Sequence, residues 1–327
     1  MIVGIESTAH TFGVGVVHNG NILANVRDPY TTEKGGIIPM DAAKHHLAAS
    51  ERVYLEALRV SGINEKKIRA IAFSSGPGLA PCLKEGMKFA KKKAEELSVP
   101  LVCVNHCVAH LEIGKITGAH DPVLLYASGA NTQIIAYASA KYRVFGETLD
   151  VGIGNFIDTF ARYIGLGFPG GPKIQQLAVG GNFIELPYSI KGMDVSFSGL
   201  LTHLQQKYTA GFNKTDLAFS LQETAFALLV EASERAMAHV GKKELVIGGG
   251  VGCNTRLQQM CRLMCEARGA KFFAPQNEFL VDNGGMIAYL GEIMFNAGIF
   301  YTSKDFDKVD INPRERTDDI NVAWRKN

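Results

Sequence analysis

A pattern of three short apolar segments separated by polar turns occurs twice in this chain. The first copy starts near residue 2 and the second near residue 122. Apolar runs bounded by turn residues predict β-strands, and three in succession predict a meander. The segments are 2–5, 13–17 and 22–24 in the first copy, and 123–126, 134–137 and 142–145 in the second. The duplication therefore predicts two related lobes. It does not indicate a solenoid, because nothing recurs at the period of about 20 to 50 residues that is typical of one.

Helical and strand segments alternate after each meander, which predicts crossover connections and a largely parallel extension of each sheet. Helices are expected near 40–60, 83–97, from about 107, and near 155–164, 172–180, 215–240 and 254–267, and strands at 68–74, 101–104, 245–247 and 271–273. The predicted fold class is α/β, with two duplicated lobes around a cleft. We assign residues 1–119 and about 295–327 to the first lobe and residues 120–294 to the second. The polar stretch 311–327 is expected to pack back on the first lobe or to fray.

The composition is that of a globular protein of about two domains. The chain has 327 residues, of which 46% are hydrophobic and 20% charged, and this excludes disordered and fibrous classes. Its net charge is +2, so any contact with nucleic acid depends on a local patch. The six cysteines include no CxxC pair, so neither a zinc ribbon nor a disulfide framework is indicated. With no signal-peptide pattern and no apolar run of about 18 residues, we expect a cytoplasmic protein without a membrane partner.

His106 and His110 directly follow the strand expected at residues 101–104. Residues four apart lie on one face of a helix, so two imidazoles at a helix start can share a metal ion. The alternative is two histidines satisfied by hydrogen bonds at that helix start. No glutamate follows His106, so the zinc-protease HExxH interpretation lacks its general base.

Polar turns follow the first strand of each meander, at Ser7–Thr11 and Ser128–Thr132. If the lobes are related by a pseudo-twofold axis, both turns point into the cleft. Small hydroxyl residues and glycine let backbone amides approach an anion such as phosphate. The alternative is a pair of ordinary hairpin turns.

A glycine-rich loop, Gly248–Gly252, follows the strand expected at 245–247 and precedes a helix that Asn254 can cap. Here the backbone can approach a nucleotide, or the loop only lets the helix pack closely. The spacing does not fit GxGxxG, and the chain contains no GxxxxGK[ST]. Neither a dinucleotide-binding fold nor a P-loop is therefore supported.

Two aspartates stand where a ligand could bind. Asp158 follows a glycine loop into a helix, where it can bind a ribose or an ion, or simply favour the helix dipole. Asp282 precedes Asn283-Gly284-Gly285 and is either a cap or a ligand.

Two segments are locally basic. Lys84, Lys88, Lys91 and Lys92 fall on one side of the helix expected at 83–97, and the segment from Lys34 to His46 contains further basic residues. Either segment could contact a phosphate backbone. The alternative for the four lysines is an exposed helix face in solvent.

Several motifs in this order resemble one protein family over about residues 2 to 312. The motifs are Gly4–Thr11, His106-x-x-x-His110, Ser128–Gln133, Phe168–Pro172, Ser196–Leu200 and Gly248–Val251. They are similar to those of the archaeal and eukaryotic tRNA N6-adenosine threonylcarbamoyltransferases, the catalytic subunit of the KEOPS complex. No protein-kinase segment follows, so the chain resembles the free-standing form.

The resemblance implies an actin-like ATPase (ASKHA) fold and a set of site residues. It implies one metal ion per chain, held by His106, His110, Tyr126 and Asp282. Two imidazoles, a phenolate and a carboxylate suit iron, our first choice, or zinc better than magnesium. The implied contacts to substrate or nucleotide are Tyr126, Ala127, Ser128, Gly129, Ala130, Asn131, Asp158, Gly171, Gln175 and Asn254. Two positions depart from the family pattern, because Ala130 replaces the usual glycine and Gln175 stands where a glutamate is common.

The implied reaction moves a threonylcarbamoyl group from its adenylate to the exocyclic amine of the adenosine beside the anticodon, in tRNAs that read codons beginning with A. Threonylcarbamoyl-AMP or ATP would occupy the cleft. No residue is identified as a general base. The implied partners are tRNA and the other KEOPS subunits: a small atypical protein kinase, a dimerising subunit and a tRNA-binding subunit. Three alternatives remain. An actin-like sugar or acid kinase normally needs a carboxylate base and has no use for the histidine pair. A metalloprotease lacks its general base here, and a nucleotide-switched scaffold would need no metal.

Overall fold

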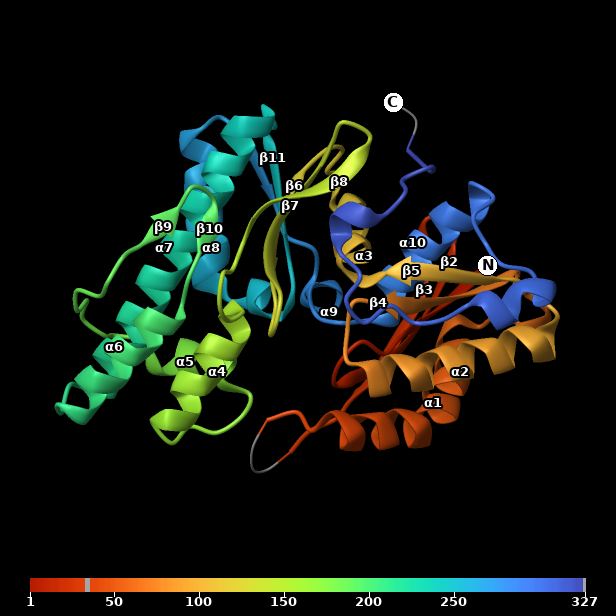
Figure 1. The fold of residues 1–327 in the computed structure, drawn as a ribbon, viewed down its shortest axis with the longest axis horizontal. Coiled ribbons are helices and arrows are strands. Elements are labelled where there is room, and N and C mark those ends of the chain that lie inside the picture. The colour runs from red at the N-terminus through yellow and green to blue at the C-terminus, as the bar shows by residue number, and fades with distance from the viewer. Residues whose placement is uncertain (33–35, 326–327) are drawn as a thin grey trace.

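The computed structural model describes residues 1–32 and 36–325, which contain two five-stranded mixed sheets (Figure 1). The first has the order β3-β2-β1-β4-β5, from β1 (Ile2–Glu6), β2 (Thr11–His18), β3 (Asn21–Pro29), β4 (Ala70–Gly76) and β5 (Leu101–Asn105). The second has the order β12-β11-β6-β7-β8, from β6 (Val123–Ala127), β7 (Thr132–Ala138), β8 (Lys141–Glu147), β11 (Glu244–Gly248) and β12 (Lys271–Phe273). In each sheet an antiparallel meander continues into two parallel strands. The predicted duplication is therefore confirmed.

Helices cover the outer face of each sheet. The first sheet carries α1 (Pro39–Ser61) and α2 (Ala80–Leu97), which pack on β2, β3 and β4. The second lobe contains α4 (Ile153–Tyr163), α5 (Gly170–Leu177), α6 (Ser198–Thr209), α7 (Lys214–Val240) and α8 (Thr255–Ala267), with a small hairpin of β9 (Ile190–Lys191) and β10 (Asp194–Val195). Short 3₁₀ turns lie at Glu65–Lys67, Gly114–Thr117, Gly250–Cys253, Ser303–Lys308 and Thr317–Asp319. In the described part of the chain, no helix is both long and apolar enough to cross a bilayer.

Each lobe has its own hydrophobic cluster, and a further cluster joins the two lobes. It combines apolar residues of both sheets with those of α3 (His106–Ile113) and α10 (Gly284–Asn296), which pack against each other (Figure 1). The helix α10 approaches β1 and β2 so closely that a Cβ on Gly4 would lie 2.1 Å from the backbone nitrogen of Ala288. Glycine lets this helix lie against the sheet, and the ends of α3 and α10 thereby meet between the lobes.

Two segments bear on the predicted lobe boundaries. The helix α10 falls within the range expected for the second lobe, but it packs on β1, β2 and β4 of the first sheet. The C-terminal segment contacts both lobes, because the Asn312 amide donates to the Ser75 carbonyl at 2.7 Å and Arg316 lies 3.8 Å from Glu147 of β8. This segment therefore links the lobes rather than packing on the first alone. Lys326, which was grouped with it, lies outside the described residues.

Candidate metal and nucleotide site

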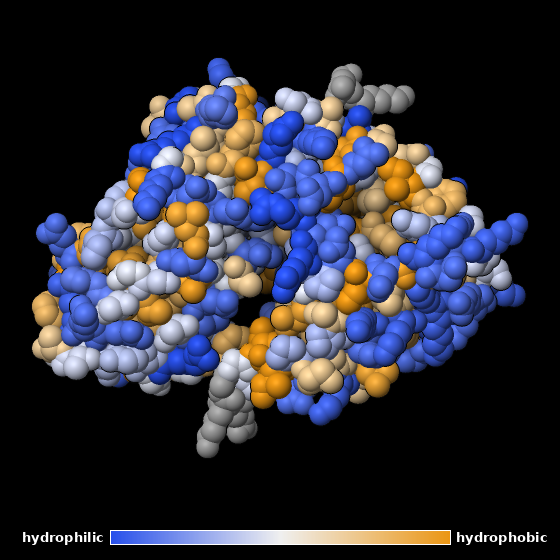
Figure 2. Space-filling view, in the orientation of Figure 1, coloured by the Kyte–Doolittle hydropathy of each residue, from blue (hydrophilic) through white to orange (hydrophobic). Residues whose placement is uncertain are grey.

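A cleft of about 1830 Å³ lies between the two lobes, and Figure 2 shows the hollow that separates them. First-lobe residues from the β1–β2 loop and the start of α3 line one side. Second-lobe residues from the β6–β7 turn, α4, α5 and the start of α8 line the other. The polar turns of both meanders face this cleft, as their recurrence in the sequence predicted.

Four side chains from three parts of the chain meet on one side of the cleft. His106 begins α3 directly after β5, and His110 lies one turn further along the helix. The Asn105 side chain caps this helix by accepting a hydrogen bond from the Val108 amide at 3.0 Å. Tyr126 lies near the end of β6, and Asp282 lies between α9 (Asn277–Leu280) and α10.

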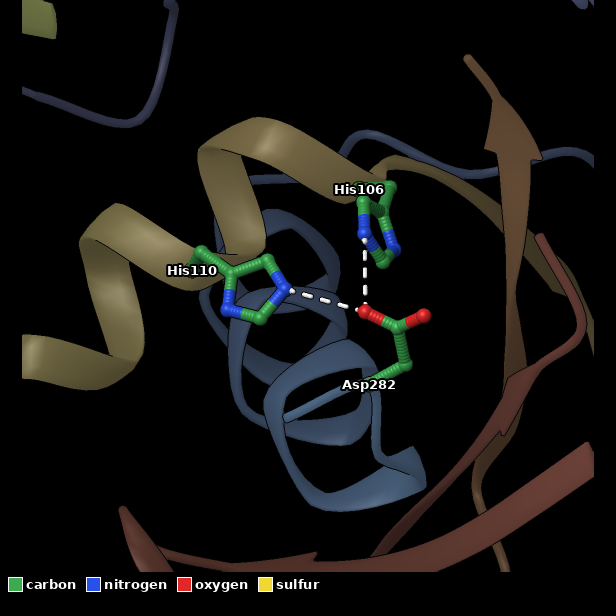
Figure 3. A group of neighbouring side chains, drawn as sticks. All are labelled: His106, His110 and Asp282. Atoms are coloured by element: carbon green, nitrogen blue, oxygen red, sulfur yellow. Dashed lines mark ion pairs between the residues drawn. The ribbon is translucent and has the colours of Figure 1, made fainter. Parts of the chain in front are cut away.

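The polar atoms of His106, His110 and Asp282 point toward one another (Figure 3). One Asp282 oxygen lies 3.4 Å from Nε2 of His106 and 3.5 Å from Nε2 of His110. The Tyr126 hydroxyl lies 3.0 Å from Nε2 of His106. Ligand atoms of the two histidines and the aspartate all lie within 4.8 Å of one another, a spacing that one metal ion can bridge.

His110 supplies an independent test of whether the residues fit a metal. Its side chain is buried, and in the described part of the chain Nδ1 has no hydrogen-bond partner, while Nε2 has only the Asp282 oxygen at 3.5 Å, too long for a good hydrogen bond. Leaving a buried polar group unpaired costs about 1 to 3 kcal/mol, and coordination through Nε2 would remove that cost. The residues present therefore fit a metal ion that takes nitrogen and oxygen ligands.

A buried carboxylate holds the other nitrogen of His106. Glu6, at the end of β1, is fully buried and places Oε2 2.9 Å from Nδ1 of His106. Its Oε1 accepts hydrogen bonds from the amide and the hydroxyl of Thr8 at 2.6 and 2.5 Å. With Nδ1 directed at Glu6, Nε2 of His106 faces Asp282, and this is how a carboxylate orients a metal-binding imidazole.

The electrostatics of the cluster differ between its two histidines. Burial acts to lower the pKa of His106, but Tyr126, Glu6 and Asp282 outweigh it and raise that pKa well above its usual value. Burial lowers the pKa of His110. Burial also opposes ionisation of Asp282, yet the two histidines hold the pKa of Asp282 well below its usual range. These directions favour an ionised Asp282 and a neutral His110, which are the forms that bind a metal ion, whereas a metal ion would have to displace a proton from His106.

The β6–β7 turn, residues 128–131, rests on the N-terminus of α4. The Gly154 and Asn155 amides donate to the carbonyls of Ser128 and Gly129 at 3.0 and 2.9 Å. A Cβ on Gly152 would lie 2.4 Å from the Gly129 carbonyl oxygen, so this contact needs glycine. The turn is thus fixed by backbone contacts, and its residues line the cleft.

The other predicted nucleotide contacts already hold parts of the second lobe. Asp158 accepts a hydrogen bond from the Gly170 amide at 2.7 Å, and burial raises the pKa of Asp158. Asn254 caps α8, as its position predicted, by accepting from the Arg256 amide at 2.9 Å. The Asn254 amide group donates to Gln222 at 2.7 Å. Gln175 donates to the Thr255 hydroxyl at 3.2 Å.

The structure brings nearly all predicted site residues to this one cleft. The exceptions are Ala127, which is fully buried in β6, and His110, which lies behind His106 with 1% of its surface exposed. Gly171 borders open space, because a Cβ there would meet no atom within 4 Å. Sequence reasoning assigned no role to Glu6, although it stands in the quoted motif Gly4–Thr11. The only available signal was a glutamate inside an apolar strand.

The lysines of α2 are largely engaged within the chain. Lys88 pairs with Glu85 at 2.7 Å, and Lys92 pairs with Glu51 at 3.6 Å. Lys91 donates to the Val309 carbonyl at 2.7 Å. These contacts favour the interpretation of this stripe as an exposed helix face. Lys34, the first residue of the other basic segment, lies outside the described residues.

Solved structures with a similar arrangement define the fold class. HypF of Thermococcus kodakarensis superposes with a TM-score of 0.64 at 15% identity, over 90% of this chain and 48% of HypF, so the chain spans about half of that protein. A ROK family glucokinase from Streptomyces griseus superposes with a TM-score of 0.51 at 14% identity, over 89% of this chain and 99% of the glucokinase. The chain therefore has the predicted actin-like ATPase fold, with its cleft between duplicated lobes.

Sequence comparison then identifies the family. The family described as TsaD, tRNA N6-adenosine threonylcarbamoyltransferase, matches residues 21–289. A tRNA N6-adenosine threonylcarbamoyltransferase of Thermococcus kodakarensis is 52% identical over 98% of this chain and 99% of its own length. One of Methanocella arvoryzae is 49% identical over 99% of this chain and 98% of its own length. The chain belongs to the tRNA N6-adenosine threonylcarbamoyltransferase family.

Proposed function

We infer that this enzyme transfers a threonylcarbamoyl group from threonylcarbamoyl-AMP to N6 of the adenosine beside the anticodon, in tRNAs that read codons beginning with A. The observation that carries the inference is the cluster of His106, His110 and Asp282 on the wall of a cleft that also contains the Ser128–Asn131 turn. A metal-binding group and a phosphate-binding turn in one cleft suit a reaction that breaks a bond to an adenylate.

We propose that His106, His110, Tyr126 and Asp282 hold one metal ion. Two imidazoles, a phenol and a carboxylate favour iron, with zinc as the alternative. The ion supplies a Lewis acid that polarises the attacked carbonyl or the leaving phosphate. Glu6 orients His106 through Nδ1 and fixes Thr8 at the cleft wall. One proposed metal ligand, His106, and the first-lobe loop are thereby held by the same buried carboxylate.

The chain's own groups have to position a weak nucleophile. The exocyclic amine of adenine carries little nucleophilic character, so rate enhancement comes from orientation and from stabilising charge on the leaving group. We assign the phosphate contact to the Ser128–Asn131 turn, which lines the cleft together with Arg27 and Arg162. Within residues 1–32 and 36–325 neither arginine forms an ion pair. Asp158, Gly171, Gln175 and Asn254 surround the place proposed for the ribose and base.

The proposed partners follow from the substrate and from longer relatives. A relative in Methanoculleus marisnigri is named a probable bifunctional tRNA threonylcarbamoyladenosine biosynthesis protein; it is 49% identical, and the match covers 60% of its length. A second function joined to this one in a single chain supports the proposal that the present chain acts with separate partners. We propose the KEOPS subunits for that role: a small atypical protein kinase, a dimerising subunit and a tRNA-binding subunit. A tRNA substrate also supports a cytoplasmic location.

Product analysis tests the proposed function. The chain, with its partner subunits and threonylcarbamoyl-AMP, is incubated with one tRNA that reads a codon beginning with A and one that does not. Mass spectrometry of the digested tRNA should find threonylcarbamoyladenosine at the position beside the anticodon in the first tRNA alone. Absence of the product from both tRNAs would reject the function.

A further inference from the structure

At one end of the second lobe, where α4 and α6 lie side by side (Figure 1), three lysines gather with two exposed aromatic side chains and one partly buried one. This surface, here called the α4–α6 surface, consists of Tyr163, Lys173, Lys207, Tyr208, Phe212 and Lys214. Tyr163 and Phe212 expose 46% and 43% of their surface, far more than aromatic residues of the core expose. Such exposed aromatic groups on a charged background mark interaction sites.

The aromatic rings are ordered by contacts within the surface. Tyr163 and Tyr208 meet edge to face with centroids 5.8 Å apart, and the Tyr163 hydroxyl lies 2.9 Å from the Thr209 hydroxyl. The ammonium of Lys207 lies 4.7 Å from the centre of the Phe212 ring, and that of Lys214 lies 5.5 Å from the Tyr208 ring. Two of the three lysines, Lys207 and Lys214, therefore stand beside an aromatic face.

The cations of this surface have no acidic partners. In the described part of the chain, no carboxylate lies within 4.0 Å of Lys173, Lys207 or Lys214. Lys173 and Lys214 donate instead to the carbonyls of Leu166 and Ile164 at 2.7 and 2.9 Å. Those two contacts have a structural role at the end of α4. An ammonium carries three donors, however, so each lysine retains protons and its full charge for an external anion.

The helix α4 contributes residues both to the cleft wall and to this surface. Arg162 precedes Tyr163 on α4 and lines the cleft. Beyond it, the lysine ammonium groups approach the carbonyls at residues 164 and 166. The α4–α6 surface therefore begins one residue beyond the cleft wall along α4.

We propose that the α4–α6 surface binds the single-stranded anticodon loop of the tRNA, with bases on its rings and phosphates on its lysines. The proposal rests on the function proposed above, because the reacting adenosine adjoins the anticodon and has to enter the cleft. Unstacked loop bases stack on aromatic side chains, and a nearby cation neutralises each phosphate. A protein partner would match the rings, but three cations without carboxylate partners favour a polyanion.

Aromatic truncation gives the first test, with the full-length protein and a transcript of a tRNA that reads a codon beginning with A. Tyr163→Ala and Phe212→Ala should each weaken tRNA binding at low salt by roughly 5- to 150-fold, the range for loss of one base–aromatic stack. The control is Tyr188→Ala, since Tyr188 is 48% exposed in the same lobe but hydrogen-bonds Glu231. Unchanged binding in both variants, or no binding by the unaltered protein at low salt, would overturn the proposal.

Salt dependence tests the lysines separately. Replacing Lys173 and Lys207 with alanine removes two phosphate contacts and should reduce the slope of log affinity against log salt by about 1.4. The matched control is Lys84→Ala with Lys88→Ala on α2, which removes two charges elsewhere and should leave the slope unchanged. If the slope changes in the control but not in the α4–α6 variant, the RNA binds at α2 rather than at the α4–α6 surface.

Failure of this proposal is distinguishable from failure of the proposed function. If the surface binds the loop, its variants raise KM for tRNA while kcat at saturating tRNA, metal content and nucleotide affinity stay as in the unaltered protein. If the unaltered enzyme modifies tRNA and the variants do so with the same KM, the α4–α6 surface does not bind the loop, and the proposed function still holds. If the unaltered protein forms no product with any tRNA, the function itself is rejected.

Discussion

The two sides of the cleft are built on different principles. On the metal side, Glu6, His106, His110 and Asp282 contact mainly one another and are nearly enclosed by the shared core. On the nucleotide side, Asp158 and Asn254 each hold a helix end or loop of the second lobe in place. The residues of the metal side therefore pair mainly within their own cluster, whereas those of the nucleotide side also hold parts of the fold.

This difference predicts how each side responds to substitution. Changes on the metal side should remove metal and leave the fold, because few structural hydrogen bonds are lost. Changes on the nucleotide side should lower nucleotide affinity and the free energy of unfolding together. The predictions below test this contrast in order of decreasing effect.

The largest effect is expected from His106→Ala and His110→Ala. Each substitution removes one of two neutral nitrogen ligands, so metal binding should be almost completely lost while the thermal unfolding midpoint changes little. Metal analysis after gel filtration, with circular dichroism as the check on folding, measures both. One equivalent of metal retained by a well-folded double variant would show that the metal lies elsewhere.

Glu6→Gln should weaken metal binding by about 10- to 100-fold, the range for loss of a carboxylate behind a metal-binding histidine. The amide still fills the site but offers His106 only one neutral acceptor. A competition titration with a chelator measures the affinity. The matched control is Glu292→Gln. Glu292 is also a buried carboxylate, but it accepts hydrogen bonds from the Asn19 and Gly20 amides and contacts no proposed metal ligand. Equal effects in both variants would mean that Glu6 acts only through stability.

Asn254→Ala and Asp158→Asn should each lower adenine-nucleotide affinity by roughly 1 to 3 kcal/mol through a lost ribose contact. Asn254→Ala should also destabilise the fold by about 0.5 to 2 kcal/mol, because it removes a helix cap. Calorimetric titration and urea unfolding separate the two effects. Asn213→Ala is the control, since Asn213 caps α7 by accepting the Thr215 amide at 2.7 Å outside the cleft lining. Unchanged nucleotide affinity in both cleft variants would contradict the assignment.

The smallest effect is expected from Gln175→Ala. Gln175 contacts Thr255 by one neutral hydrogen bond at 3.2 Å, so its loss should change nucleotide affinity by only about 0.5 to 1.5 kcal/mol. The same calorimetric titration applies. A loss as large as that in Asp158→Asn would show that the glutamine replaces the family's glutamate in full.

The contrast between the two sides also explains what the sequence revealed. The duplicated meander predicted both sheets, because strand periodicity and turn residues are local signals. The helices α6 and α10 were not predicted. The helix α10 opens with Gly284-Gly285, and glycine has a low helix propensity. Its glycines instead allow close packing against the first sheet. Tertiary packing determined that helix.

The site shows the same division. The spacing of His106 and His110 was readable because helical periodicity places them on one face. The role of Glu6 could not be predicted, because its contact with His106 spans 100 positions in sequence and depends on β1 and β5 flanking β4 in the sheet. The cations of the α4–α6 surface were missed for a similar reason, because their lack of carboxylate partners exists only in the folded chain.

The most direct test of the account is to measure tRNA modification and metal content in the same preparations of the unaltered protein. The protein is assayed as purified, after chelation, and after reloading with iron or with zinc, with threonylcarbamoyl-AMP, tRNA and the partner subunits supplied. The account predicts that the threonylcarbamoyladenosine formed falls with metal occupancy and returns on reloading. Full modification by a folded, metal-free chain would contradict it.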